Sequence, residues 1–549
     1  MKRYRAPGVL AGLAWGVLAG HAFAAPTVVE TVVLGPFTGH DAKLHPDNVA
    51  PLQIEYYGTD LGFSYEHAGK IHFLFGDTWA TEAYAPIQKS TGNRFDDGFG
   101  TIELSTYPDP SRFAPGNVPL IELGQNAGTT EMSAIDPGVV MDLGKTPLAG
   151  FSNGSREFAI FNTTKALGCR ADADCGTGFA CDTGLGFLGV PYTQEESLTL
   201  PCIDGEPACT ADTMKDSVGA ALAGSGFCID RTSSIWADTA AGRLSATVFQ
   251  QRVGLRSLAD PRQYTDIQRW PSNKFVNVIA RTVNEFQPPE GTGRVRSDYR
   301  AAAGTGRAQR VLLWGRPGFI GVGAKQRTLG VYFAYVDLPA GPGFSWTPRY
   351  FTGTAANGAP RFSAHEADAV ALDLDASATG IQSAETYDIV NQMSVAWVAP
   401  LKKWVMFYGG GLTKLPSPAL RNCGVLELFA GRECKDVVMG NGAVRMRTAD
   451  NPWGPWTPPQ DVIVGGDASV PGSGQFGVGG VLHHPSCTAA GCATHSRTSF
   501  YHADEYGFLY AANIIDPWIR PAGGGVDVIW NASTWDPYRV VLLRTRIRP

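Results

Sequence analysis

The sequence predicts an all-β protein of the five-bladed β-propeller class that carries a disulfide-rich insertion. Two observations lead to this prediction: a composition dense in turn-forming residues, and a strand-like apolar segment that recurs along the chain without helical periodicity. The 549 residues include 66 Gly and 37 Pro, with 11% aromatic and 17% charged residues. This composition is typical of a turn-rich protein with a large core, and it excludes a disordered chain.

The recurring segment is an apolar run that ends in an aromatic residue and is followed by a small or polar turn. Its five copies begin at residues 70, 157, 310, 403 and 506 and read KIHFLFGDT, EFAIFNTTK, RVLLWGRPG, KWVMFYGGG and YGFLYAANI. Successive aromatic residues are 86, 153, 94 and 102 positions apart: Phe75, Phe161, Trp314, Tyr408 and Tyr510. Strand-rich repeats of this length fit propeller blades with long loops, and a pair of β-sandwiches is the alternative.

The first 24 residues have the features of a secretory signal peptide. Lys2, Arg3 and Arg5 form a basic start, residues 8–20 are apolar, and Ala22-Phe23-Ala24 matches the small-residue pattern of a cleavage site. We therefore expect a mature propeller domain over residues 25–549 and a secreted or periplasmic location. No later run of about twenty apolar residues follows, so membrane insertion is not expected.

The ten cysteines agree with an oxidising compartment. Six lie between Cys169 and Cys228, in a stretch with too few apolar residues for a core, so residues 169–228 are expected to form an inserted module held by disulfides. Their pairing stays open, since six cysteines allow fifteen connectivities. Local pairs are expected for the other four: Cys423 with Cys434, and Cys487 with Cys492. An oxidising compartment favours disulfides over metal binding at these cysteines, so neither a metal nor a cofactor is expected.

The formal net charge of -6 gives the chain no basic surface of the kind that binds nucleic acid. The informative charges are instead two aspartates in the first repeat. Asp60 lies in Gly58-Thr-Asp-Leu-Gly62, and Asp77 follows the strand-like run in Phe75-Gly-Asp-Thr-Trp79. Small residues beside each acid let backbone and ligand approach closely. Two carboxylates at the ends of neighbouring strands favour glycoside hydrolysis, which needs a proton donor and a nucleophile or base.

Further polar residues are candidates for contacts with a sugar, although structural roles in turns and loops compete for several of them. We expect six such substrate-binding residues: Asp41, Asn277, Arg316, Arg327, Glu366 and His502.

The order of several motifs resembles glycoside hydrolase family 183, a former domain of unknown function. The motifs are GTDLG at residues 58–62, FGDTW at 75–79, the run from Met393 to Tyr408, Arg447-Thr448 leading to PWGPW at 452–456, and STWDPY at 533–538. The resemblance extends from about Val33 to the C-terminus without the cysteine module. It implies a five-bladed propeller with endo-D-arabinanase activity on α-D-arabinofuranosyl linkages of mycobacterial arabinogalactan and lipoarabinomannan. It also implies catalytic roles for Asp60 and Asp77.

Two other functions stay open on the sequence. One is a non-catalytic carbohydrate-binding propeller, and the other is a propeller glycosidase for another furanoside polysaccharide such as L-arabinan or fructan. The sequence does not distinguish which aspartate is the acid, nor retention from inversion.

Overall fold

The computed structural model describes about half of the chain, and this includes all strands of the predicted repeats. The described residues are 25–38, 59–76, 87–88, 94–95, 97–105, 109–115, 122–123, 145–166, 168–169, 171–174, 180–182, 226–229, 249–259, 263–272, 274–275, 277–283, 309–316, 331–339, 341–374, 386–388, 390, 392–409, 412–414, 444–463, 509–534 and 539–549.

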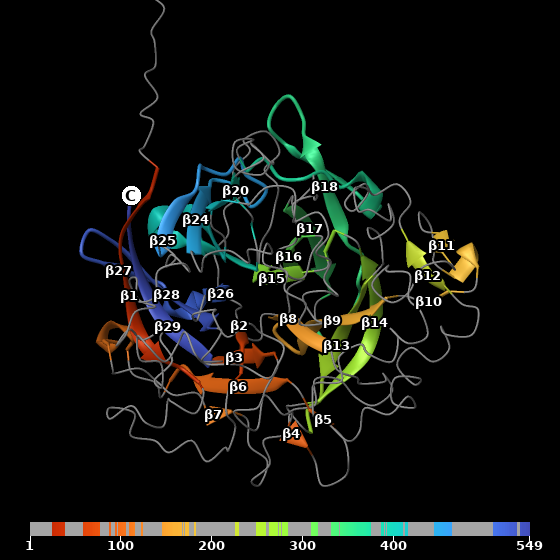
Figure 1. The fold of residues 1–549 in the computed structure, drawn as a ribbon, viewed down its shortest axis with the longest axis horizontal. Helices are drawn as coiled ribbons and strands as arrows, with labels where there is room; N and C mark the ends of the chain where they lie inside the picture. The colour runs from red at the N-terminus through yellow and green to blue at the C-terminus, as the bar shows by residue number, and fades with distance from the viewer. Residues whose placement is uncertain are drawn as a thin grey trace, which may run out of the picture.

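Within these residues the chain forms five antiparallel sheets arranged radially as the blades of a propeller (Figure 1). Blade 1 has the order β2-β3-β6-β7 and blade 2 the order β8-β9-β13-β14. Blade 3 runs β15-β16-β17-β18-β19, blade 4 β21-β22-β24-β25, and blade 5 β26-β28-β29-β1 with β27 beside β28. The prediction of an all-β five-bladed propeller is therefore confirmed.

The strand bounds, blade by blade, are β2 Leu61–His67, β3 Lys70–Phe75, β6 Gly98–Glu103 and β7 Glu122–Leu123; β8 Lys145–Ser152, β9 Glu157–Ala166, β13 Phe249–Arg256 and β14 Tyr264–Ser272; β15 Asn277–Val283, β16 Gln309–Arg316, β17 Tyr332–Leu338, β18 Arg349–Thr354 and β19 Pro360–Ser363; β21 Met393–Val398, β22 Lys403–Gly409, β24 Val444–Ala449 and β25 Gln460–Ile463; β26 Leu509–Ile514, β27 Arg520–Ala522, β28 Gly525–Thr534, β29 Arg539–Arg548 and β1 Thr27–Pro36.

The ring is closed by the two ends of the chain. Strand β1 is the outermost strand of blade 5, where it pairs antiparallel with β29 from Thr27 opposite Arg548 to Pro36 opposite Val541. Around the axis, the innermost strands contact one another in the order β2, β8, β15, β21, β26 and back to β2. The first and last blades are therefore neighbours, which brings residues about 450 positions apart into contact.

Five apolar clusters fill the spaces between neighbouring blades, because alternate residues of each strand face opposite blades. In β22, Trp404, Met406 and Tyr408 pack towards blade 3, whereas Val405 and Phe407 pack towards blade 5. The cluster between blades 1 and 2 is the smallest, with six buried residues: Tyr65, Leu74, Phe99, Ala159, Phe161 and Tyr264. Polar side chains complete that interface.

Four of the five aromatic markers occupy the expected equivalent position, and one does not. Phe75, Phe161, Trp314 and Tyr408 all lie on the second strand of their blades, whereas Tyr510 lies on β26, the first strand of blade 5. The second strand there is β28, which contains Trp530. The two segments share an apolar character because both are buried, so residue type alone did not separate them.

One arginine occupies the propeller axis. Arg281 on β15 donates hydrogen bonds to the carbonyl oxygens of Val395 (2.8 Å), Ile514 (3.1 Å) and Ser64 (3.3 Å), which belong to blades 4, 5 and 1. It also donates to Ser394 Oγ (2.8 Å) and lies 3.4 Å from Asp516 Oδ2. A single side chain thus links the inner strands of four blades at one level of the axis.

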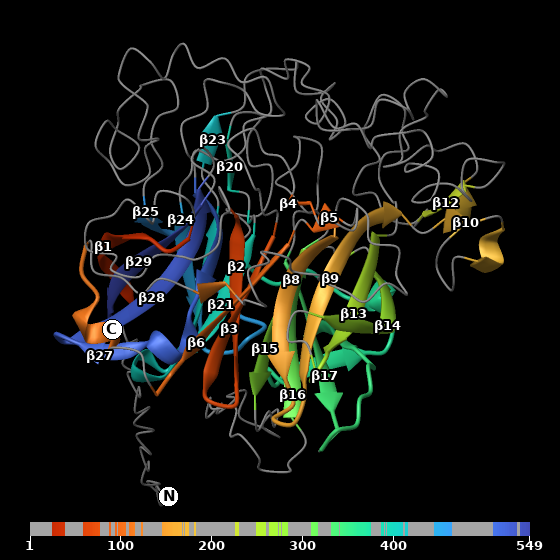
Figure 2. The same cartoon turned by 90° about the horizontal axis from the view of Figure 1, so that it is seen from below.

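Short elements lie outside the blades. A three-stranded sheet of β10 (Gly168–Cys169), β12 (Gly226–Ile229) and β11 (Ala180–Asp182) overlaps the predicted insertion and extends one residue beyond each of its ends. It is located to the side of blade 2 (Figures 1 and 2). The cysteine side chains lie outside the described residues, as do Cys423, Cys434, Cys487 and Cys492, so the disulfides stay predictions. Strand pairs β4 (Ile87–Gln88) with β5 (Arg94–Phe95) and β20 (Thr386–Asp388) with β23 (Leu412–Lys414) complete the strands.

The helical segments of the described residues are 3-10 turns: η2 Pro110–Arg112, η3 Asp172–Asp174, η5 Glu366–Asp368, η6 Ala399–Leu401 and η10 Asp516–Trp518. In this part of the chain there is no helix with the length and apolar character that crossing a membrane requires.

Candidate functional site at one end of the propeller axis

Asp60 lies directly before the innermost strand of blade 1 and is 8% exposed. Its Oδ2 accepts a hydrogen bond from the hydroxyl of Tyr510, on the innermost strand of blade 5, at 2.9 Å. Its backbone carbonyl accepts a hydrogen bond from the N–H of Gly76 at 3.1 Å. The acid is thus fixed between the first and last blades, beside the axis.

The backbone that follows Asp60 is irregular. Leu61 and Gly62 have φ values of 65° and 74°, and the pairing of β2 with β3 shifts register between Leu61 and Phe63. This is a β-bulge, which locally bends a strand and redirects its side chains. A positive φ in a leucine costs on the order of 1–3 kcal/mol and persists only where the surroundings enforce it.

Three polar side chains of blade 5 hold this bulge. Ser533 Oγ accepts a hydrogen bond from the N–H of Leu61 at 2.6 Å. The amide groups of Asn513 and Asn531 both donate to the carbonyl oxygen of Gly62, at 3.0 and 2.9 Å. All three residues are buried, so the unusual backbone is fixed by a rigid neighbouring blade.

Gly76 provides the space that the Asp60 carboxylate occupies. A Cβ atom at position 76 would collide with Oδ1 of Asp60 and with the side chain of Leu61. Thr59 Oγ1 donates to the carbonyl of Gly76 at 3.3 Å, so residues 59 and 60 both contact this glycine. The glycine of the FGDTW motif is therefore part of the site, whereas Asp77 itself lies outside the described residues.

A second buried acid lies across the same blade. Asp97, 3% exposed, directly precedes Gly98, which pairs with Phe75 on β3. The alternation of β6 puts Asp97 on the same face as Phe99 and Thr101, and Gly76 shares that face with Leu74 and His72. Asp60, Gly76 and Asp97 therefore form a row across three strands, with the acids about two strand spacings, roughly 10 Å, apart at the backbone. Sequence reasoning missed Asp97, although an acid directly before the Gly-Phe-Gly start of a strand was a usable signal.

Asn277 and Arg316 lie at the same end of the propeller as Asp60. His67 at the end of β2 contacts Ser152 at the end of β8 (Nδ1 to Oγ, 2.7 Å), and Thr282 near the end of β15 donates to the carbonyl of Ser152 (3.1 Å). The ends of these three inner strands thus lie together, and so do their starts. Asn277 starts β15 and pairs with Arg316 on β16.

Both residues are buried, Asn277 to 1% and Arg316 to 0% exposure. Burial lowers the pKa of Arg316 to about 10. The structure thus brings Asn277 and Arg316 to the same end of the molecule as Asp60, and their contact with a sugar stays a prediction.

Glu366 has a structural contact that the sequence did not indicate. Its Oε1 accepts a hydrogen bond from the backbone N–H of Lys274 at 2.8 Å, just before β15. The Lys274 ammonium group donates in return to the carbonyls of Glu366, Ala367 and Ala369 at 2.9–3.1 Å. Glu366 therefore fastens η5 to the segment that leads to Asn277. The remaining predicted residues, Asp41, Arg327 and His502, lie outside the described residues.

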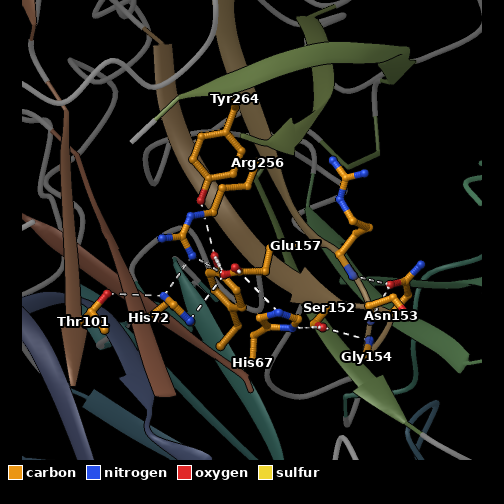
Figure 3. A network of polar contacts seen from close by, with 12 residues as sticks. His67, His72, Thr101, Ser152, Asn153, Gly154, Glu157, Arg256 and Tyr264 are labelled. Carbon is orange, nitrogen blue, oxygen red and sulfur yellow. Dashed lines mark hydrogen bonds and ion pairs between the residues drawn. The ribbon is translucent and has the colours of Figure 1, made fainter. Parts of the chain in front are cut away.

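A second polar cluster was not predicted at all. It lies between blades 1 and 2, towards the other end of the propeller, and centres on Glu157 (Figure 3). Glu157 forms an ion pair with Arg256 and accepts a hydrogen bond from Tyr65 at 2.9 Å. Its Oε2 also lies 3.3 Å from Nε2 of His72. The pKa of Glu157 is lowered: burial opposes ionisation, but the ion pair and hydrogen bond with the Arg256 cation outweigh it.

The geometry also defines the protonation of His72. Burial lowers its pKa to about 3, so it is neutral near pH 7. Arg256 Nη1 lies 3.2 Å from His72 Nδ1, and arginine can only donate, so Nδ1 is the acceptor. The ring proton is therefore on Nε2 and faces Glu157. The cluster is a network of polar side chains that joins blades 1 and 2.

No protein-family model matches the sequence, and no curated protein matches it either. Solved structures similar to the chain include a Bacteroides ovatus protein (8% identity, TM-score 0.38), covering 90% of this chain and 86% of the other. A family 43 enzyme of Xanthomonas citri in complex with xylotriose has 9% identity and a TM-score of 0.29, with 91% of each chain covered. An α-L-arabinofuranosidase of Podospora anserina has 9% identity and a TM-score of 0.28, covering 95% of this chain and 98% of the other. Likenesses at these TM-scores carry no weight for the activity of this chain.

Proposed function

We propose that this protein is an exported glycoside hydrolase, an endo-D-arabinanase that cleaves α-D-arabinofuranosyl linkages in mycobacterial arabinogalactan and lipoarabinomannan. The observation that carries the proposal is Asp60, a buried carboxylate held by Tyr510 beside the axis of a five-bladed propeller. Burying a carboxylate costs folding free energy, so a carboxylate buried at the end of an axial strand is a candidate catalytic group.

Hydrolysis of a glycoside needs two carboxyl groups, one on each side of the scissile bond. Asp77 is the proposed partner of Asp60. It follows Gly76 in the chain, and Gly76 donates a hydrogen bond to the backbone of Asp60. Asp97 supplies a further carboxyl group on the same blade.

The substrate rests on the motif resemblance to glycoside hydrolase family 183, and the exported location rests on the predicted signal peptide over residues 1–24. A carbohydrate-binding propeller without activity and a glycosidase for another furanoside are the two competing functions. Asn277, Arg316, Arg327, Glu366, Asp41 and His502 are the proposed sugar-binding residues.

Product analysis separates these functions. The mature protein is incubated in parallel with mycobacterial arabinogalactan, L-arabinan and fructan, and the products are separated by size. Release of an oligosaccharide ladder from arabinogalactan alone is the expected result. An oligosaccharide ladder from L-arabinan or fructan instead would show that this polysaccharide is the substrate. Retarded migration of the protein in a glycan-containing gel, with no product released, supports the binding function instead.

Isosteric variants test the two carboxylates. Asp60→Asn and Asp77→Asn should each reduce kcat by orders of magnitude with a nearly unchanged melting temperature. The double variant should be little worse than either, because the two groups act as a unit. Asp450→Asn is the matched control, since Asp450 is an exposed acid paired with Lys403 on blade 4. Near-normal rates in both single variants would refute the assignment. Asp41→Asn and Glu366→Gln should reduce kcat less than Asp60→Asn or Asp77→Asn.

A further inference from the structure

Backbone strain in the described part of the chain is concentrated around Asp60. Four non-glycine residues there have positive φ: Leu61, Ala68, Lys402 and Ala511. Ala68 belongs to the turn between β2 and β3, and Lys402 to the turn before β22. The other two belong to innermost strands, where extended backbone is the rule: Leu61 is the first residue of β2, and Ala511 lies within β26.

These two residues flank one hydrogen bond. Leu61 follows Asp60, and Ala511, with a φ of 52°, follows Tyr510. Each lies at a shift in strand register, between Leu61 and Phe63 in β2 and between Tyr510 and Asn513 in β26. Bulges redirect the side chains next to them. Two irregularities on adjacent blades thus aim Asp60 and Tyr510 at each other.

We propose that Tyr510 is a positioning residue that holds Asp60 in place as an ionised carboxylate, which assigns to Asp60 the role of nucleophile or base. The inference rests on the proposed glycosidase function. A phenol ordinarily ionises near pH 10 and a carboxyl near pH 4, so the proton of this hydrogen bond stays on tyrosine. Donation to a carboxylate favours its charged form.

The role is consistent with both mechanisms of glycoside hydrolysis. With inversion, Asp60 takes a proton from water while the water oxygen bonds to the anomeric carbon. With retention, a carboxylate oxygen of Asp60 itself forms that bond, and water later cleaves the resulting ester. In either case the bond from the anomeric carbon to the leaving oxygen breaks, and that oxygen takes its proton from another acid, for which Asp77 is the candidate.

Other titratable or charged groups also bear on the ionisation of Asp60. Asp97 lies across Gly76 on blade 1, and a second acid opposes ionisation of the first. Arg316 lies at the same end of the propeller, on blade 3. Arg281 lies deeper on the axis, four residues further along the inner strands, where it contacts Ser64 and Ile514 and pairs with Asp516.

The test compares Tyr510→Phe with Tyr350→Phe. Tyr350, on blade 3, is a matched control, because its hydroxyl accepts a hydrogen bond from Trp270 of blade 2 at 3.0 Å. Tyr510→Phe should lower kcat on arabinogalactan at least tenfold with little change in KM. It should also move the acidic limb of the pH profile of kcat/KM to higher pH, since Asp60 then ionises less readily. Tyr350→Phe should leave the profile in place. A wild-type rate and profile in Tyr510→Phe would overturn the proposal.

A second measurement needs no substrate. Thermal unfolding of wild type, Tyr510→Phe, Asp60→Asn and the double variant forms a cycle, measured at pH 7 and at pH 3. A hydrogen bond to a carboxylate is stronger than one to the neutral acid, so its contribution is present while Asp60 is ionised and is lost when acid protonates Asp60. Tyr510→Phe should therefore lower Tm more at pH 7 than at pH 3, and less in the Asp60→Asn background. If the Tm changes of the two substitutions are coupled but no glycan is cleaved, the glycosidase function is refuted and the Tyr510–Asp60 contact is supported. If the Tm changes are additive at pH 7, the positioning role is refuted.

Discussion

At the scale of single residues, Gly76 is as much a part of the site as the acid beside it. We predict that Gly76→Ala displaces the Asp60 carboxylate, because the added methyl group would occupy the space of Oδ1 and of the Leu61 side chain. Overpacking of this kind costs about 1–3 kcal/mol. Activity should fall at least tenfold, and denaturant unfolding should show the loss of stability.

Gly343→Ala is the control for this substitution. A Cβ atom there would meet only the ring of Pro339, at 3.3 Å, and its φ is not in the left-handed region. Equal losses of activity in both variants would show that the effect of Gly76→Ala is not local to Asp60.

The sequence predicted Asp60 because short-range features mark it: an acid between glycines, directly before an aromatic-rich strand. Tyr510 was recognised only as a repeat marker. Its contact with Asp60 spans 450 positions and exists because the first and last blades are neighbours, which a local pattern does not encode. The carboxylate of Glu366 likewise bonds to a backbone N–H, a partner that residue types do not predict.

At the scale of strands, the bulge in β26 predicts that replacing Ala511 by glycine has little effect on stability. Replacing a buried alanine by glycine normally destabilises a strand by about 0.5–1 kcal/mol or more. At Ala511, with a φ of 52°, glycine relieves an unfavourable backbone conformation. Ala511→Gly should therefore be within about 0.5 kcal/mol of wild type, while Ala512→Gly in the same strand should show the usual loss.

Ala511→Val completes the comparison, because a β-branched residue fits positive φ poorly and the site is fully buried. It should be the least stable of the three in chemical denaturation. If Ala511→Gly destabilises as much as Ala512→Gly, the bulge is not strained.

The interface of blades 1 and 2 should make the protein sensitive to acid. His72 has its pKa lowered to about 3 by burial, so between its ordinary value of 6.5 and 3 the unfolded chain binds a proton that the folded chain does not. Stability therefore falls as pH decreases through this window, by at most about 1.4 kcal/mol per pH unit from this residue. Below its ordinary pKa of 4.5, Glu157 adds a loss of the same sign.

His72→Gln should reduce the slope of stability against pH between 6.5 and 4.5, as measured by urea unfolding at several pH values. The exposed His365, changed to glutamine, should leave the slope unchanged. An unaltered slope in His72→Gln would show that His72 does not control the acid response.

At the scale of the whole molecule, repeat spacing was sufficient to predict the number of blades, because each blade contributes one buried inner strand that ends in or contains a marker aromatic: the second strand in blades 1 to 4 and the first strand in blade 5. The closure of the ring was not predicted. It depends on β1, whose sequence TVVETVVLGP is rich in Val and Thr, is compatible with any edge strand and does not specify pairing with β29. The axial arginine was also missed, since Arg281 in Ala280-Arg-Thr-Val283 is not distinguished from a surface arginine by its neighbours.

Arg281 should be the single side chain on which the assembly of the blades depends most. Replacing it with methionine leaves carbonyl groups of blades 1, 4 and 5 without this donor and Asp516 without its cation. The pKa of Asp516 is already raised by burial, an effect that Arg281 opposes, so the variant should favour its neutral form further. Breaking a fully buried charge pair typically costs about 3–5 kcal/mol, and the 33% exposure of the Asp516 side chain puts this pair below that range.

We therefore expect Arg281→Met to lower Tm markedly, with unfolding still in one transition, since the arginine joins four blades at one level. Arg281→Lys should recover only part of the loss, because an ammonium group has three donors and lacks the planar reach of guanidinium. Arg310→Met, which removes an ion pair with the exposed Asp337, should cost no more than about 1 kcal/mol. Separate unfolding transitions in Arg281→Met would mean that the blades are joined mainly by their apolar interfaces. A loss of stability no larger than that of Arg310→Met would mean that water replaces the axial hydrogen bonds.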